Sequence, residues 1–147
     1  MLGARDATRE KAVGQFAQML ERYVAAFNAG DTAGYAAFYA PGVVLVNGAG
    51  EELRGPQAIT AFYAALRGQV SRELVVEGTV EGADTLAAAL RSCFVALEDG
   101  VAVGSVVLNR GDRFHLRSMA LYEIENGRFT RIQAVSLERT VVRKGEQ

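Results

Sequence analysis

The side chains that could do nucleophilic or metal chemistry are few in this sequence. It contains one cysteine, Cys93, and one histidine, His115. One of each cannot form an internal disulfide or supply a zinc site built from these two residue types. A Cys93–His115 nucleophile pair would need both side chains on one face of neighbouring strands, which nothing in the pattern requires. We therefore expect no metal site and no organic cofactor.

Carboxylates are the other candidates for acid and base chemistry. The aspartates fall at a terminus, a helix cap or a turn. Residues 72–81 alternate, with Leu74, Val76 and Val80 on one side and Glu73, Glu77 and Glu81 on the other, which should face water. In residues 128–142 the alternation puts Glu138 on one face with Ser136, and Glu138 becomes the candidate for proton transfer if that face is turned inward. The alternative is a solvated position near the end of a strand.

Composition limits the class of protein. The chain has 147 residues, half of them apolar, and a net charge of −1, which fits one folded domain over residues 1–147 and excludes disorder. No basic excess is available for nucleic acid. No apolar run approaches the length of a membrane span, and the N-terminus lacks the apolar segment of a signal peptide. We expect a cytoplasmic protein that binds neither nucleic acid nor membranes.

Hydrophobic periodicity places the helices in the first half of the chain. Phe16, Leu20, Tyr23 and Phe27 form one stripe of a helix expected from about Thr8 to Ala29. Gly30 is suited to end this helix and Asp31 to cap the next. The pattern predicts helices over 31–40 and 56–67. Between these two helices it predicts a hairpin of short strands, the first of them over 43–47.

Long strands follow in the second half. They are expected over 72–81, 85–97, 113–124 and 128–142, with Asn126-Gly127 as a tight hairpin turn. Residues 101–112 are less regular and indicate a flap or a loose strand pair. This order predicts an α+β fold in which the helices cover one face of a curved antiparallel sheet.

The order and spacing of several segments resemble a known family. They are RYVAAFNAGD, YAAFYAPGVVLVNGAG, RGPQAITAFYAAL and ENGRFTRI. Together they resemble the nuclear-transport-factor-like superfamily, which includes ketosteroid isomerases and SnoaL-like polyketide cyclases. The resemblance covers about residues 12–140. It implies a cone-shaped half-barrel whose three N-terminal helices and concave sheet enclose a pocket for a small, mostly apolar molecule.

The resemblance also implies roles for particular positions. Tyr23 matches the helix-one tyrosine that donates a hydrogen bond to the dienolate oxygen in ketosteroid isomerases; a core tyrosine bonded to the backbone is the alternative. Asn47 stands where those isomerases place their catalytic aspartate, and Asn cannot act as a base at neutral pH. It could orient a ligand or serve only the turn with Gly48. Ala120 stands at or near the position of the strand carboxylate that ketosteroid isomerases and SnoaL-like cyclases use. The two positions where a catalytic carboxylate is expected therefore hold Asn47 and Ala120.

Strand alternation assigns the remaining positions. If Ala120 faces inward, Ser118 and Tyr122 do too, and by the resemblance Ser136 shares the concave face. We expect these residues, with Asn47, Phe27 and Tyr63, to bind the ligand. Arg91 is expected on the outside as an ordinary surface charge; facing inward, it could instead bind a ligand carboxylate. The convex residues are His115, Arg117, Met119, Leu121, Gln133, Val135 and Leu137. This mixture of apolar and polar side chains predicts a covered surface, and we expect a homodimer through it.

Three functions remain open at this point. The first is a protein that binds a small apolar molecule and acts as a cofactor-independent isomerase or cyclase on a steroid-like or polyketide-like substrate. Tyr23 would then stabilise negative charge and Glu138 would transfer the proton. The second is a ligand carrier or sensor without catalysis, which explains the missing carboxylates more directly. The third is a dimeric interaction module whose pocket is filled.

Overall fold

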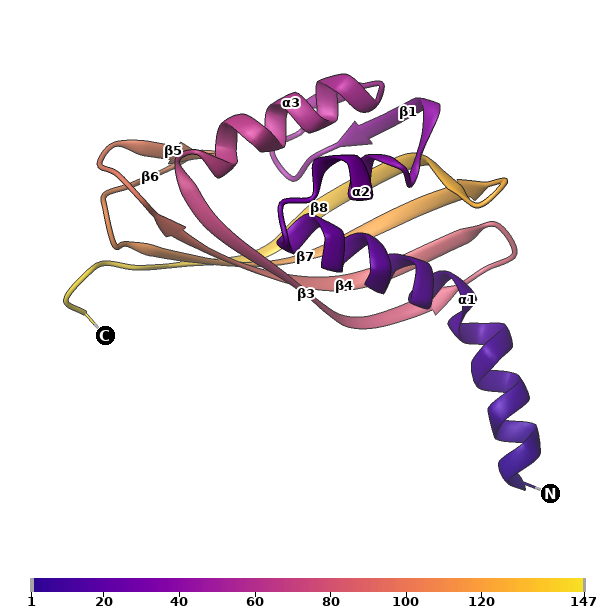
Figure 1. The fold of residues 1–147 in the computed structure, drawn as a ribbon. Coiled ribbons are helices and arrows are strands. Elements are labelled where there is room, and N and C mark those ends of the chain that lie inside the picture. The colour runs from indigo at the N-terminus through magenta and orange to yellow at the C-terminus, as the bar shows by residue number, and fades with distance from the viewer. Residues whose placement is uncertain (1, 147) are drawn as a thin grey trace.

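The protein forms a curved six-stranded sheet covered on its concave side by helices, as predicted (Figure 1). The computed structural model describes residues 2–146, and side chains from residue 14 onward. The helices are α1 (Leu2–Asn28), α2 (Thr32–Ala36) and α3 (Pro56–Arg67). The strands are β1 (Tyr39–Val46), β2 (Glu52–Arg54), β3 (Val70–Glu81), β4 (Thr85–Ala96), β5 (Val101–Val103), β6 (Val106–Leu108), β7 (Arg113–Glu125) and β8 (Arg128–Val142).

The sheet is mixed rather than wholly antiparallel, which corrects the sequence prediction. Its strand order is β2-β1-β8-β7-β4-β3, and β1 runs parallel to β8 with Leu45 opposite Ile132. No turn joins these two strands, so no local signal sets their relative direction. The second helix is also shorter than predicted, because the chain from Tyr39 joins the sheet opposite Phe129.

Predicted helix and turn signals are confirmed in several places. Leu20 is fully buried on α1, and α1 packs across β3. The Asp31 side chain accepts the N–H of Gly34 at 3.0 Å, so it caps α2. Asn126 and Gly127 both have positive φ, as a two-residue hairpin of this type requires. Residues 101–112 contain the separate two-stranded ribbon β5–β6.

Two β-bulges reverse the predicted alternation. In β3 the register shifts between Val76 and Gly78, so Val80 is 73% exposed instead of sharing the buried face. Beyond that bulge, the carboxylate of Glu81 accepts the N–H of Ala17 at 2.7 Å and is no longer on the wet side. In β8 an extra residue, Leu137, shifts the register beside β7. Each bulge exchanges the faces of the residues that follow it.

Candidate functional site

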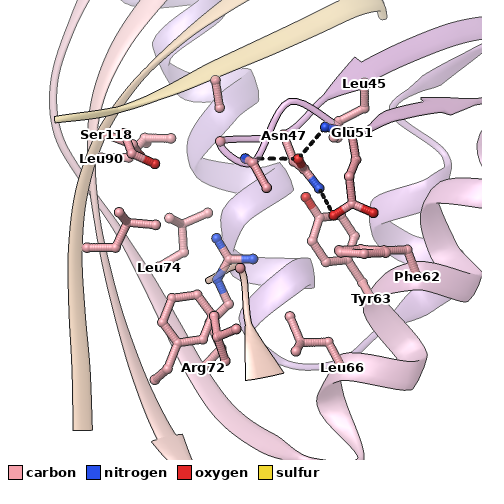
Figure 2. A pocket seen from close by; sticks show the side chains of 18 of the residues that line it. Leu45, Asn47, Glu51, Phe62, Tyr63, Leu66, Arg72, Leu74, Leu90 and Ser118 are labelled. Atoms are coloured by element: carbon pink, nitrogen blue, oxygen red, sulfur yellow. Dashed lines mark hydrogen bonds between the residues drawn. The ribbon is translucent and has the colours of Figure 1, made fainter. Parts of the chain in front are cut away.

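A cavity of about 740 Å³ lies between the concave sheet and the helices. Its wall includes residues from α1, α3, the β1–β2 turn, the β5–β6 ribbon and the long strands (Figure 2). Most of these side chains are apolar or aromatic. Both the volume and the character of the wall are typical of a site for a small organic ligand.

The structure brings most of the predicted site residues together. The predicted residues that line the cavity are Tyr23, Phe27, Asn47, Tyr63, Ser118, Ala120, Tyr122 and Ser136. Strand alternation put Ser118, Ala120 and Tyr122 on one face of β7, the resemblance indicated that this face is the concave one, and all three are buried. Their contact with a ligand stays a prediction.

Glu138 does not face the cavity, and the expectation that it turns inward was wrong. Leu137 is the extra residue of the β8 bulge, so Glu138 pairs with Arg117 on the outer face. Its carboxylate accepts a hydrogen bond from the Arg117 guanidinium at 3.3 Å and is exposed. The same bulge turns Arg139 toward the cavity, where its exposed side chain contributes to the wall.

Two tyrosine hydroxyls form a hydrogen bond at the edge of the cavity. The hydroxyl oxygens of Tyr23 and Tyr39 are 2.6 Å apart, and both rings are buried. Burial, with the neighbouring Tyr39, raises the pKa of Tyr23 well above its usual value. Burial likewise raises the pKa of Tyr39 and of Tyr122. These phenols therefore keep their protons near neutral pH and can act as hydrogen-bond donors but not as bases.

The pairing leaves one proton for a ligand. Two hydroxyls that share one hydrogen bond use one of their two protons. When Tyr39 donates to Tyr23, the O–H of Tyr23 can donate elsewhere, and Tyr23 is the member of the pair that lines the cavity. Tyr23 thus has a hydroxyl partner, rather than the backbone carbonyl of the alternative, and keeps the capacity to bind a ligand oxygen.

Asn47 organises the β1–β2 turn and a carboxylate beside it. Its Oδ1 accepts the N–H groups of Ala49 and Glu51, each at 3.0 Å. Its Nδ2 donates to Oε1 of Glu51 at 3.3 Å (Figure 2). A Cβ on Gly48 would lie 2.6 Å from Oγ of Ser136, so glycine lets this turn pack against β8. Asn47 therefore serves the turn and at the same time holds the Glu51 carboxylate in the wall.

Sequence reasoning missed Glu51. In the described part of the chain, Glu51 is the one acidic residue that lines the cavity. Alternation does not apply within a turn, so nothing in the pattern indicated where this side chain points.

Arg72 was also missed, although a signal for it existed. The alternation that buries Leu74 turns Arg72 to the same face of β3. Its guanidinium carbon lies 4.8 Å from the ring centre of Phe94, 5.3 Å from that of Phe27 and 5.7 Å from that of Tyr63. One terminal nitrogen donates to Oγ of the fully buried Ser92 at 3.2 Å.

Cys93 and His115 occupy opposed positions on β4 and β7, on the convex face. Both are half-buried, and neither lines the cavity. The adjacency that a Cys–His pair needs is thus present, but it lies on the other side of the sheet from the cavity. Arg91 is exposed on this outer face, as expected.

Within residues 2–146, among the side chains described from residue 14 onward, no three His, Cys, Asp or Glu are grouped as metal ligands would be. No helix in the same range is both long enough and apolar enough to cross a lipid bilayer.

Comparison with solved structures places the fold. An LEH-like epoxide hydrolase from M. tuberculosis has a TM-score of 0.69 and 13% identity, over 86% of this chain and 85% of that chain. A protein assigned as a polyketide cyclase from Xanthomonas campestris pv. campestris has a TM-score of 0.70 and 20% identity, over 81% and 87%. A computationally designed 17-OHP binder has a TM-score of 0.67 and 19% identity, over 84% and 95%. At these identities the likeness concerns the fold alone.

Sequence comparison then identifies the family. No curated protein matches the chain. The family model of the SnoaL-like domain matches residues 20–132, which extend from the second half of α1 into β8 and include most of the cavity wall. The chain therefore belongs to the SnoaL-like domain family.

Proposed function

We propose that this protein binds a small, largely apolar ring compound of the steroid-like or polyketide-like kind in the cavity. The observation that carries the proposal is the cavity itself, about 740 Å³ with mainly apolar and aromatic walls. A wall of this kind removes apolar ligand surface from water, and a few polar groups orient the ligand. The designed 17-OHP binder of similar fold supports the choice of ligand class.

Polar groups of the wall fit a ligand with one or two oxygen atoms. Tyr23 donates a hydrogen bond, and the hydroxyls of Ser118 and Ser136 can donate or accept. Their positions on α1, β7 and β8 surround the cavity. An apolar ring body with a carbonyl or hydroxyl would satisfy these groups without a cofactor.

Thermal shift with a cavity-filling variant tests this function. Progesterone and aromatic ketones are expected to raise the melting temperature of the wild-type protein, since a ligand at 100 times its Kd stabilises the folded state by about 2.7 kcal/mol. Ala134 lies in the wall of the cavity, so Ala134→Trp is expected to abolish the shift.

The matched control is Val80→Trp, because Val80 is 73% exposed on β3 and does not line the cavity. This variant should retain the full shift. Equal shifts in both variants would place binding outside the cavity, and no shift with any ring compound would contradict the proposed function.

A second candidate function is cofactor-independent proton transfer, as in an isomerase or cyclase. The observation that favours it is the Glu51 carboxylate, which Asn47 holds in the wall. A carboxylate there could remove a proton next to a ligand carbonyl, while Tyr23 donates to the oxygen that becomes negative. A carrier or sensor would use the same cavity without this step.

We also propose a homodimer through the convex sheet face. The exposed apolar side chains of that face on β7 and β8 are Met119, Leu121, Val135 and Leu137, with exposed fractions of 37% to 61%. Sedimentation should show a dimer that Leu121→Lys converts to a monomer, because a charge would be buried without a partner. A wild-type protein that is monomeric at about 100 µM, where a Kd of about 1 µM would give a dimer, would contradict this proposal.

A further inference from the structure

One cationic side chain projects into the otherwise apolar part of the cavity. Arg72 extends from β3, and its guanidinium points toward the space between Leu74 and Tyr63 (Figure 2). It enters from the end where α3 meets β3, away from the Asn47 turn.

The surroundings of Arg72 do not balance its charge. Three aromatic rings lie within 6 Å of the guanidinium carbon, and Ser92 supplies a neutral hydroxyl. The Nε atom is buried and has no hydrogen-bond partner. None of the ion pairs in the described part of the chain includes Arg72. Glu51, the carboxylate of the wall, accepts a hydrogen bond from the amide of Asn47 instead.

A guanidinium in such a place is expensive to keep if its only role is packing. Arg72 is half-buried and its Nε is buried, and charged groups are rarely removed from water, even in part, without an opposite charge nearby. Aromatic faces attract a cation but do not replace a carboxylate, which accepts two parallel N–H bonds from arginine. Methionine or leucine would fill the same volume among Phe27, Tyr63 and Phe94 without the cost of desolvation.

We propose that the ligand of this cavity carries a carboxylate, which Arg72 binds, at one end of its apolar ring body. This inference rests on the proposed function and names the chemical group that the ligand presents. One guanidinium balances one negative charge, so a monocarboxylate fits better than a phosphate dianion. Arg139, the second arginine of the wall, is exposed, so water already solvates its guanidinium.

Calorimetry with matched acids and amides tests the inference. The probes are naphthylacetate with naphthylacetamide, and a bile acid with its neutral amide, because each pair differs in charge but hardly in shape. Wild-type protein is expected to bind each acid at least about ten-fold more tightly than its amide, the scale of a hydrogen bond to a charged group.

Arg72→Met is expected to abolish the preference, so that the acid and its amide bind with about equal affinity, because the charge is lost while the apolar wall is kept. Affinity for the amide should change by less than about three-fold, which also shows that the variant is folded. Arg91→Met is the matched control, since Arg91 is an exposed arginine on the outer face of β4, the strand next to β3. It removes the same charge, and the ten-fold preference should remain.

Three results would contradict the inference. Equal affinity of wild-type protein for acid and amide would overturn it while leaving the proposed function intact. A preference for the acid that persists in Arg72→Met would assign the carboxylate to another cation. Failure of both members of every pair to bind would contradict the proposed function and the inference together. If Arg72→Met does not fold, Arg72→Lys serves instead, and it should lower the preference because lysine lacks the planar pair of donors.

Discussion

Replacing Phe129 by alanine is expected to lower the free energy of unfolding by about 3–5 kcal/mol. Phe129 is the largest of the fully buried side chains in the described part of the chain. Its ring centre lies 5.0 Å from that of Tyr122 and 5.2 Å from that of Tyr23. The change therefore removes a large apolar side chain and opens a void among residues that also line the cavity. Denaturation by urea, followed by circular dichroism, measures the loss.

Such a loss would be a large part of the stability of an ordinary domain, which is about 5–15 kcal/mol. Val80→Ala is the control, because Val80 is 73% exposed on β3, and it should change the free energy of unfolding by less than about 0.5 kcal/mol. A loss below about 1 kcal/mol for Phe129→Ala would mean that this aromatic cluster does not hold the helices to the sheet.

Replacing Glu51 by glutamine is expected to slow proton exchange at least about 100-fold if the protein is an isomerase or cyclase. The assay follows exchange of the α-proton of a β,γ-unsaturated ketone into deuterium oxide by mass spectrometry. Glutamine keeps the oxygen that accepts the Asn47 hydrogen bond, so the turn should persist while the basic carboxylate is lost. Binding of the ketone, measured by thermal shift, should remain.

Glu52→Gln provides the matched control. Glu52 is the next residue, forms an ion pair with Arg54 on β2 and does not line the cavity. Its exchange rate should equal that of the wild-type protein. Binding of the ketone without any exchange in wild-type protein would favour the carrier or sensor. Exchange that is unchanged in Glu51→Gln would remove Glu51 from the reaction.

The sequence was sufficient wherever a regular period continued without interruption. On β7 the alternation put Ser118, Ala120 and Tyr122 on one face, and all three are buried together. Helix α3 begins at Pro56 and ends at Arg67, between Gly55 and Gly68, as the local signals predicted. These features depend on neighbours in the chain, so they can be read from short segments.

Prediction failed where one residue was added to a strand. The bulges at Glu77 and Leu137 have no distinctive sequence, but each exchanges the two faces of the strand beyond it. Glu138 was expected inside for this reason and lies outside beside Arg117. A bulge depends on how two strands match over their whole length, which local patterns do not contain.

The sequence by itself determined the order of helices and strands along the chain, the family resemblance and which residues of α1 and β7 share the face that lines the cavity. Only the tertiary structure decided which polar groups meet there. Arg72 has the phase of a buried residue in the sequence, but its lack of an acidic partner depends on segments far away in the chain. Tyr23 pairs with Tyr39, and Asn47 holds Glu51. Charge balance is a property of three-dimensional neighbours, because Coulomb attraction follows distance in space rather than separation along the chain.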